Sequence, residues 1–233
     1  MESISDLVAL SATFGVVISI IGYGLGVLIK NKTGLGIFNP LLISIIFVMV
    51  ILSVFRIDYK DYNVSARYLS YLLTPATVSL AIPLYIHIER LKRNWAGILV
   101  GLLSGSLTSM GSVLVMSALF HLSHRQYVTL LPKSITTAIG MGISGELGRM
   151  VTISVAVIIV TGILGNVLAV SVRKLFSITD PVAKGLAIGA AAHAIGNSKA
   201  MEIGDIEGAM ASLAIVVNGL ITVIGASFFA MLY

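Results

Sequence analysis

The sequence predicts an all-α integral membrane protein, and three observations lead to this fold class. Hydrophobic residues make up 57% of the 233 positions and charged residues only 11%, a balance far from that of soluble domains. Apolar runs of about 20 residues lie between short charged clusters, and a helix of that length crosses a hydrocarbon core about 30 Å thick. Several runs also carry Pro, Gly and ionisable residues, which indicate broken helices. We expect a single polytopic membrane domain over residues 1–233.

The apolar runs predict about eight hydrophobic segments. They cover residues 7–29, 37–55, 69–88, 96–119, 128–143, 151–172, 182–200 and 209–232. The first is expected to be a membrane helix and not a secretion signal, because Glu2 and Asp6 stand before it in place of basic residues. The sequence contains no cysteine, which excludes disulfides and thiolate metal sites, and we expect no metal or cofactor.

Basic residues in the loops indicate the orientation in the membrane. The net charge of +5 is spread over short loops, which is typical of topology signals and not of nucleic-acid binding. Acids at the N-terminus and lysines at 30–32 favour an outside N-terminus, so that residues 90–93 fall inside. An even count of crossings then places residues 56–67 and the basic pair at 173–174 outside, in conflict with the same rule, unless a segment is re-entrant.

Four segments have the composition of plain membrane helices, with small and aliphatic residues and no buried charge. These are residues 7–29, 37–55, 151–172 and 209–232. Glycine pairs within them, Gly22 with Gly26 and Gly162 with Gly165, are expected to let helix backbones approach closely.

Three other stretches are predicted to be broken. Two prolines interrupt residues 73–85, a Pro-Lys pair and four glycines lie within 130–148, and glycines are spaced along 189–204. In hydrocarbon an unsatisfied backbone group costs several kcal/mol, so irregular backbone persists only where it is buried in protein or lines a cavity. The three breaks together predict a cavity, although each alone is also explained by a proline kink or a glycine packing face.

The two halves of the chain, 1–120 and 127–233, echo each other loosely. In the first a broken helix runs into the charged stretch 87–94, and in the second into 199–208; a long apolar helix follows each time. This pattern suggests an inverted repeat, whose substrate site would lie between the repeats.

Lys133 is the first candidate for ligand binding. It starts a broken segment, and Ser134, Thr136 and Thr137 lie within one turn of it. The N-terminus of a half-helix offers free backbone donors and a positive dipole end, which suit a carboxylate or a phosphate. Thr74 and Thr77, on either side of a proline, offer similar groups in the other half, so these features indicate a small anion.

His193 and Asn197 form the second candidate pair. At i, i+4 on a helix they would share a face with small residues and could reach one oxygen-rich ligand. Nearby, Lys199 and Glu202 are expected either to pair as part of the site or to snorkel to the interface. Glu207 is expected near the start of the last helix, where an acid suits the helix dipole.

The sequence also contains two motifs that are typical of other chemistries. The motif GISG at 142–145 fits the pattern of rhomboid-type proteases, with Ser144 as nucleophile and His193 as base, but glycine-rich membrane helices produce such a motif by chance. The motif HLSH at 121–124 lacks a further ligand for a metal site, and a loop explains it better. We therefore expect no enzymatic activity.

Three stretches, LLTPATVSLAIPLY (72–85), LLPKSITTAIGMGISGELG (130–148) and GAAAHAIGNSKAMEIGDIEGAMASLAIVVNGLIT (189–222), resemble the signature blocks of the LrgB/CidB family. The resemblance implies a multi-pass protein of the bacterial inner membrane, often encoded beside a small LrgA/CidA-type partner. It also implies one of two functions. One is an antiholin-like regulator of murein hydrolase export and cell lysis, and the other is a secondary transporter of small carboxylates of the pyruvate, lactate or glycolate/glycerate type.

The residue pattern favours the transporter, because a pore regulator has no need of broken helices that carry polar groups toward a cavity. We expect a homo-oligomer in the lipid bilayer. By position in the family blocks, the expected substrate-binding residues are Thr74, Pro75, Thr77, Pro83, Lys133, Ser134, Thr136, Thr137, His193, Gly196, Asn197, Ser198 and Lys199. The residues expected in proton coupling or gating are Glu202, Glu207 and Glu146.

Departures from the family pattern fall inside the expected site. Ala138 stands where the family usually has proline, and Gly145 precedes Glu146 where an ISE triplet is usual. Ala192 replaces the serine before the histidine, and Asn-Ser at 197–198 replaces Thr-Ala. These changes predict an altered substrate.

Overall fold

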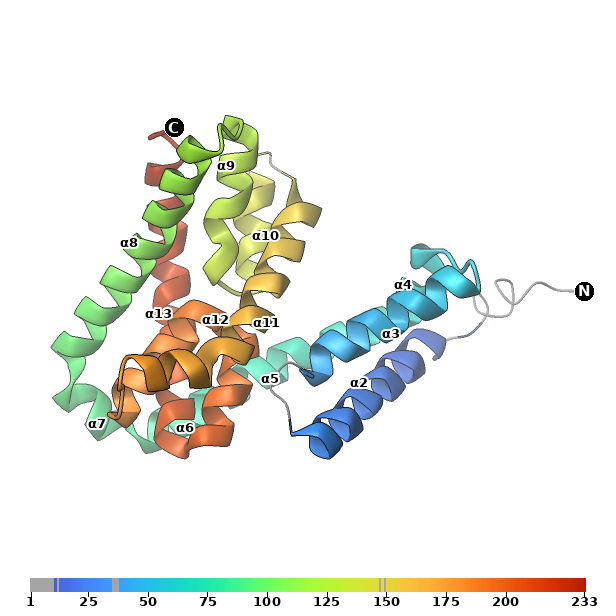
Figure 1. Cartoon of the computed structure of the whole chain (residues 1–233), viewed down its shortest axis with the longest axis horizontal. Coiled ribbons are helices and arrows are strands. Elements are labelled where there is room, and N and C mark those ends of the chain that lie inside the picture. Colours follow the sequence, from blue (N-terminus) through green and yellow to red (C-terminus); the bar gives the residue numbers. More distant parts are fainter. Residues whose placement is uncertain (1–10, 12, 35–37, 147, 149) are drawn as a thin grey trace, which may run out of the picture. The chain divides into compact units, whose positions relative to one another are not determined.

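The computed structural model describes residues 11, 13–34, 38–146, 148 and 150–233 (Figure 1). Within these residues all regular secondary structure is helical. The chain forms two compact units, residues 1–79 and residues 80–233, and each is described by itself. This boundary differs from the predicted halves 1–120 and 127–233, which stay a prediction together with the single domain.

The N-terminal unit is built on a pair of antiparallel helices. Its elements are α2 (Phe14–Thr33), α3 (Pro40–Val54), α4 (Tyr59–Ala66), η1 (Arg67–Leu72) and α5 (Leu73–Ser79). Asn39 caps α3 by accepting the Leu41 amide at 2.8 Å, and Pro40 suits the first helical position. A Cβ at Gly26 would lie 2.6 Å from the carbonyl oxygen of Pro40, so α2 and α3 approach closely there, as predicted.

The described residues of the C-terminal unit form nine elements. They are α6 (Ala81–Ile86), α7 (Ile88–Arg93), α8 (Trp95–Leu119), α9 (His124–Leu130), η2 (Leu131–Ser134), α10 (Thr137–Glu146), α11 (Val151–Leu175), α12 (Pro181–Ile203) and α13 (Asp205–Phe229). Helix α13 is the most buried, because α12 packs along it and α8 and α10 contact it as well.

Five helical stretches in the described residues are long and apolar enough to cross a membrane. They are Phe14–Thr33, Tyr59–Ile86, Trp95–Leu119, Val151–Leu175 and Asp205–Phe229. Helix α3 is apolar but shorter, and the remaining predicted segments, around 128–143 and 182–200, are bent back on themselves. The all-helical membrane class is therefore confirmed, whereas the count of about eight segments is not.

Residues 124–146 form a hairpin, here called the first hairpin. Ile135 is extended, with φ −122° and ψ 178°, so the helical chain stops after η2 and restarts as α10. The two arms lie side by side: Ser144 donates to the hydroxyl of Ser154 at 2.7 Å, and Ser154 donates to the carbonyl of Thr129 at 2.8 Å. The chain thus returns to the end of the unit at which it entered.

Helix α12 also turns back on itself, at His193, where φ is 40° and ψ is −137°. A Cβ at Gly196 would lie 3.0 Å from the carbonyl oxygen of Ile188, which a straight helix would hold about 12 Å away. Residues 181–203 are therefore called the second hairpin. Both of its arms follow α13, since Gly185 meets Glu207 on one arm and Asn197 meets Ser212 on the other.

The two hairpins enter the C-terminal unit from opposite ends. Leu91, Val182 and Ile206 pack in one apolar cluster, which joins α7 to the starts of α12 and α13. Tyr127 and Ala226 belong to a second cluster at the other end, where the first hairpin begins. Opposed hairpins are compatible with an inverted repeat but do not confirm it.

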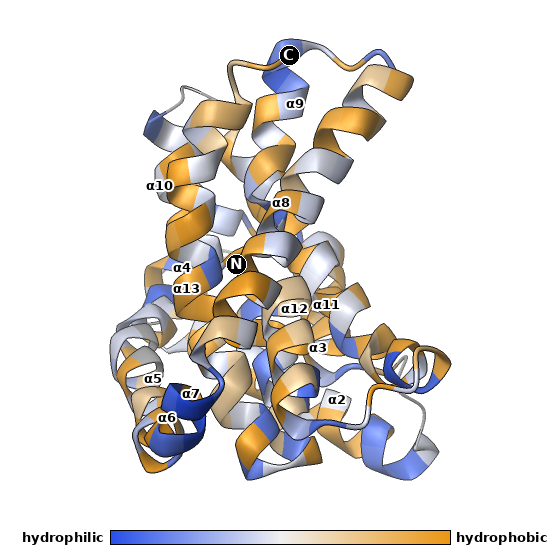
Figure 2. Ribbon diagram, turned by 90° about the vertical axis from the view of Figure 1, so that its left-hand side faces the viewer, coloured by the Kyte–Doolittle hydropathy of each residue, from blue (hydrophilic) through white to orange (hydrophobic). Residues whose placement is uncertain are grey.

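The end that carries α7 is rich in basic residues and is here called the basic end. Figure 2 shows α7 as strongly hydrophilic beside mostly apolar helices. Lys184 starts the second hairpin and shares a pocket with Arg173 and Lys174, so the pair at 173–174 lies at the same end as residues 90–93. The even count of crossings placed these two basic groups on opposite sides, whereas here the first hairpin returns to the end at which it entered, as the alternative of a re-entrant segment requires.

Candidate functional site

The tip of the first hairpin holds a polar group of three side chains. Pro132 lacks an amide donor and has non-helical angles, φ −81° and ψ 17°, so the helix loosens at the position before Lys133. The ammonium of Lys133 donates to the hydroxyls of Ser109 on α8 at 3.1 Å and Ser134 at 3.2 Å. The two hydroxyls are themselves hydrogen-bonded at 2.8 Å.

This trio has hydrogen-bond donors to spare. An ammonium has three donor hydrogens and each hydroxyl has one, and the trio uses three of these five hydrogens internally. One ammonium hydrogen and one hydroxyl hydrogen therefore remain for a ligand. Two adjacent donors, one of them charged, match the two oxygens of a carboxylate.

A cavity of about 930 Å³ opens beside the trio. It runs along α8 from Gly97, near the basic end, to Ser112, and the small residues Ala187 and Ala191 of the second hairpin form another wall. Its hydroxyl groups come from Ser104, Thr108, Ser109, Ser112, Ser134 and Thr161. Among the described residues that line it, Lys133 is the one charged side chain.

The electrostatics of the cavity favour an anion. No carboxylate of the described residues pairs with Lys133 or lines the cavity. A cation within a membrane protein costs at least about 2.5 kcal/mol to insert and usually marks a ligand or a partner. No group of His, Asp or Glu suited to a metal ion occurs in the described part of the chain.

Asn218 of α13 joins the tips of the two hairpins. Its amide donates to the carbonyl of Ser134 at 2.9 Å and to the carbonyl of Ala190 at 3.2 Å, and its oxygen accepts from Ser106. A break at His193 deprives the preceding turn of its usual helical donors. The buried Asn218 therefore satisfies backbone acceptors at both breaks, which hydrocarbon could not do.

His193 points away from the cavity. Its Nε2 lies 3.0 Å from the carbonyl oxygen of Ile158 on α11, and its ring fills the space left by Gly162. The side chain is 2% exposed. Because the backbone reverses at His193, the expected i, i+4 face shared with Asn197 does not form; Asn197 instead accepts the hydroxyl of Ser212 at 3.4 Å.

The other predicted site residues of the third family block, Gly196, Ser198 and Lys199, lie on the second arm of the second hairpin and do not line the cavity. Gly196 packs between the arms, and Ser198 donates to the carbonyl of Ile195 at 2.8 Å. Lys199 donates to Glu202 at 2.8 Å in an exposed pair, as the spacing suggested.

The remaining predicted residues are more scattered. Thr136 and Thr137 are half-buried at the start of α10, outside the cavity lining. The other residues lie as follows: Thr74, Pro75 and Thr77 in α5 of the N-terminal unit, Pro83 half-buried in α6, Glu146 exposed at the end of α10, and Glu207 buried in the first turn of α13. Glu207 lies 3.5 Å from the ammonium of Lys184.

The motif GISG does not form a Ser-His pair. Ser144 is buried and donates to Ser154, while His193 is bound to the backbone of α11. Ser144 thus serves to join the arms of the first hairpin.

Two residues at the centre of the site, Ser109 and Asn218, were not predicted from the sequence. A usable signal was present in α8, where Ser104, Thr108 and Ser112 recur every fourth residue in an apolar helix and so mark one polar face. Asn218, a lone amide in the long apolar run of α13, was the other signal.

Apolar spans, two opposed hairpins and a cavity that carries hydroxyl groups and one lysine define the class of this chain as a helical membrane protein. The chain matches the LrgB-like family over residues 19–232. It therefore belongs to the LrgB family, as the signature blocks suggested.

Curated relatives support this assignment. The chain is 36% identical over 212 residues to the antiholin-like protein LrgB of Bacillus mycoides (strain KBAB4), Bacillus cereus (strain B4264) and Bacillus anthracis (strain CDC 684 / NRRL 3495). The match covers 91% of this chain and 92% of each relative. No solved structure matches the chain.

Proposed function

We propose that this protein is a multi-pass secondary transporter of small carboxylates, of the pyruvate, lactate or glycolate/glycerate type, in the bacterial inner membrane. The observation that carries the proposal is the trio of Lys133, Ser109 and Ser134 at the cavity. It presents one charged and one neutral donor hydrogen, and no carboxylate among the described residues neutralises it.

The position of the trio supports transport over simple binding. Lys133 lies at the tip of one hairpin, and Asn218 connects that tip to the second hairpin, which enters from the opposite end. Broken segments around a central site are the usual arrangement in secondary transporters. In this proposal, Glu207, Glu202 or Glu146 supplies proton coupling or gating, and His193 and Asn197 contact the substrate's hydroxyl or keto oxygen in another conformation.

Uptake by reconstituted liposomes tests the proposal. The purified chain should take up labelled pyruvate, glycolate or lactate saturably, and Lys133→Ala should lower uptake by at least about tenfold, the equivalent of one lost charged hydrogen bond. Lys92→Ala, which removes an exposed ammonium on α7 outside the cavity lining, is the matched control and should leave uptake near the wild-type level. Uptake that is equal in both variants would contradict the site.

A second function is favoured by the names of the relatives. These are antiholin-like proteins, which supports a regulator of murein hydrolase export and cell lysis that acts with an LrgA/CidA-type partner. Co-reconstitution with such a partner separates the two functions. Dye leakage that depends on the partner and is unaffected by Lys133→Ala would favour the regulator, and carboxylate uptake without the partner would favour the transporter.

A further inference from the structure

The loop between α11 and α12 carries a polar pocket that the proposed function does not use. The pocket measures about 340 Å³ and is lined by Arg173, Lys174, Ser177, Ile178, Thr179 and Lys184. It thus combines three cations with two hydroxyls, and no carboxylate is among the described residues that line it. Cations and hydroxyl donors in one pocket are suited to a phosphate group.

The charge of this pocket is only partly compensated within the protein. Lys184 lies 3.5 Å from the buried Glu207. Asp180 uses its carboxylate to cap α12, accepting the amide of Ala183 at 2.8 Å. In the described part of the chain neither Arg173 nor Lys174 has a carboxylate partner. Two positive charges therefore remain for a ligand.

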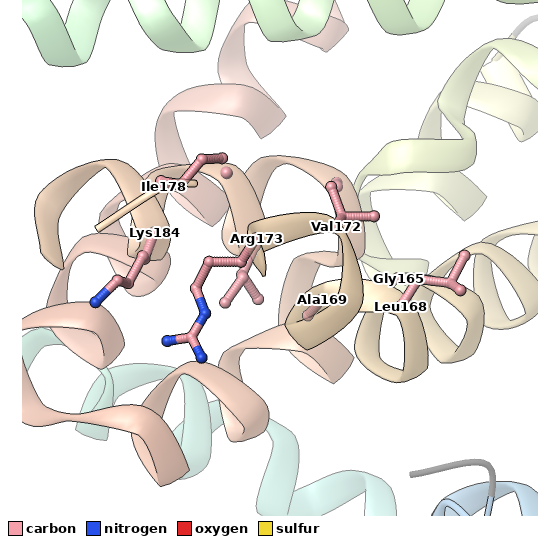
Figure 3. Close-up of a pocket in the computed structure, with 10 residues that line it drawn as sticks. Gly165, Leu168, Ala169, Val172, Arg173, Ile178 and Lys184 are labelled. Atoms are coloured by element: carbon pink, nitrogen blue, oxygen red, sulfur yellow. The ribbon is translucent and has the colours of Figure 1, made fainter. Parts of the chain in front are cut away.

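An apolar groove continues from the same pocket. It measures about 240 Å³ and lies between α11 and the first arm of the second hairpin (Figure 3). Arg173, Ile178 and Lys184 line both the groove and the polar pocket. The rest of the groove is formed by small and aliphatic residues, Gly165, Leu168, Ala169, Val172, Ala187, Ile188 and Ala191. Figure 3 shows the charged ends of Arg173 and Lys184 directed to the same side, away from Leu168.

The surface around the groove is apolar and exposed. Leu168 is 49% exposed, Val172 43% and Phe176 69%. Side chains of this kind on a membrane protein face lipid, so the groove lies where an acyl chain is at hand. The cations lie at the basic end, where a membrane helix meets the headgroup region.

We propose that this site binds an anionic phospholipid, with its phosphate held by Arg173, Lys174 and Lys184 and an acyl chain in the groove. A polar, positively charged pocket that opens directly into an apolar one is complementary to a molecule with an anionic head and a hydrocarbon tail. A free anion would leave the groove unfilled, and a neutral lipid would leave the charges uncompensated. The site goes beyond the proposed transport, because its phosphate-binding pocket shares no residue with the substrate cavity; the groove borders that cavity at Gly165, Ala187 and Ala191.

Lipid binding by the full-length protein in neutral detergent tests the proposal. Native mass spectrometry should show phosphatidylglycerol bound in preference to phosphatidylcholine with the same acyl chains. Arg173→Gln combined with Lys174→Gln should weaken phosphatidylglycerol binding about tenfold or more, since each basic residue near an anionic lipid surface has an effect of that order. The matched control is Arg90→Gln combined with Lys92→Gln, which removes two exposed charges at the same end.

The groove is tested separately. Ala169→Phe, which fills the groove, should weaken binding of the lipid. Binding of glycerol phosphate should be unchanged, because glycerol phosphate has no acyl chain. Val172→Trp replaces this variant if Ala169→Phe does not fold. Equal lipid binding by the Arg173/Lys174 variant and the Arg90/Lys92 control would overturn the proposal. Glycerol phosphate binding as tightly as the lipid, with no effect of the groove variants, would overturn it as well.

Discussion

The burial of Lys133 is not explained by a contribution to the stability of the fold. It lies in an apolar chain without a carboxylate partner among the described residues, and its stabilising contacts are two serine hydroxyls. Hydrogen bonds to neutral hydroxyls compensate only part of the cost of removing an ammonium from water. A residue that lowers stability and persists at a cavity is expected to serve a ligand.

The first prediction separates stability from function at this residue. Lys133→Met should leave the thermal unfolding temperature unchanged or raise it, because methionine is of similar length and carries no charge to desolvate. Lys184→Met is the comparison: it leaves the buried Glu207 without its partner, so its unfolding temperature should fall. Scanning fluorimetry of both variants measures this, and a Lys133→Met variant that unfolds earlier than Lys184→Met would show that Lys133 is structural.

The second prediction concerns Asn218. Asn218→Leu removes the donors to the carbonyls of Ser134 and Ala190, and unsatisfied buried groups cost about 1–3 kcal/mol each. We expect a clear fall in unfolding temperature. Asn94→Ala, which loses a bond to the Arg90 carbonyl at an exposed position, should have little effect. Similar losses in both variants would rule out a special role for Asn218.

Among single residues, Lys133 and Ser134 were correctly predicted to lie at a break, because the Pro-Lys pair and the hydroxyl residues that indicate the break are adjacent in sequence. It did not allow the pairing with Ser109 or Asn218, which lie 24 and 84 residues away in sequence. Local patterns do not determine which helices meet. His193 was expected at the cavity for its chemistry, but burial against Ile158 and Gly162 directs its ring elsewhere.

At the scale of elements, small residues on α12 decide how closely the second hairpin approaches α13. A Cβ at Gly189 would lie 2.5 Å from the carbonyl oxygen of Ala211, and at Gly185 it would lie 2.4 Å from that of Glu207. A Cβ so close to a backbone oxygen can be accommodated only if one of the two helices moves. The contact between the hairpin and α13 therefore depends on these glycines.

The third prediction follows from this contact. Gly189→Ala should destabilise the protein and lower its yield, because its methyl group would force the first arm away from α13. Gly111→Ala on α8, where a Cβ meets nothing within 4 Å, should be neutral or slightly stabilising, since alanine favours a helix by about 1 kcal/mol over glycine. Circular dichroism melts compare the two, and equal stability of both would show that α12 and α13 are not held by close packing.

Most segment positions followed from the sequence, since runs of apolar residues are bounded by charges. The interruption at Ile135 was expected from Pro132 and the hydroxyls that follow. A break within 189–204 was also predicted, but its position at His193 was not, because a non-glycine residue at positive φ has no reliable sequence signal. The tertiary contacts of both arms with α13 impose it.

At the scale of the whole molecule, the first hairpin changes the topology of the chain. Because it returns to the end at which it entered, α7 and the 173–184 loop lie at one end and Tyr233, which donates to the Leu122 carbonyl at 2.7 Å, lies at the other. The positive-inside rule then predicts that the basic end faces the cytoplasm. The pair at 173–174 then falls on the same side as residues 90–93, in agreement with the same rule.

The fourth prediction uses the absence of cysteine from the chain. Single-cysteine variants Lys92→Cys, Thr179→Cys and Met231→Cys should divide into two groups when intact cells are treated with a membrane-impermeant thiol reagent. Met231→Cys should react directly, and the other two should react only after the membrane is permeabilised. Labelling of Lys92→Cys and Thr179→Cys from opposite sides would show that the first hairpin crosses the membrane.

The contact of the Asn218 carboxamide with both hairpin tips is also relevant to the membrane potential. A membrane that stores a voltage discharges wherever water and ions find a continuous channel through it. If the proposed transport proceeds by alternating access, the hairpin that moves outward would have to break its hydrogen bond with Asn218, while the other hairpin keeps its own. The cavity would then not open to both sides of the membrane at once, and no ions would leak through the protein during substrate transport.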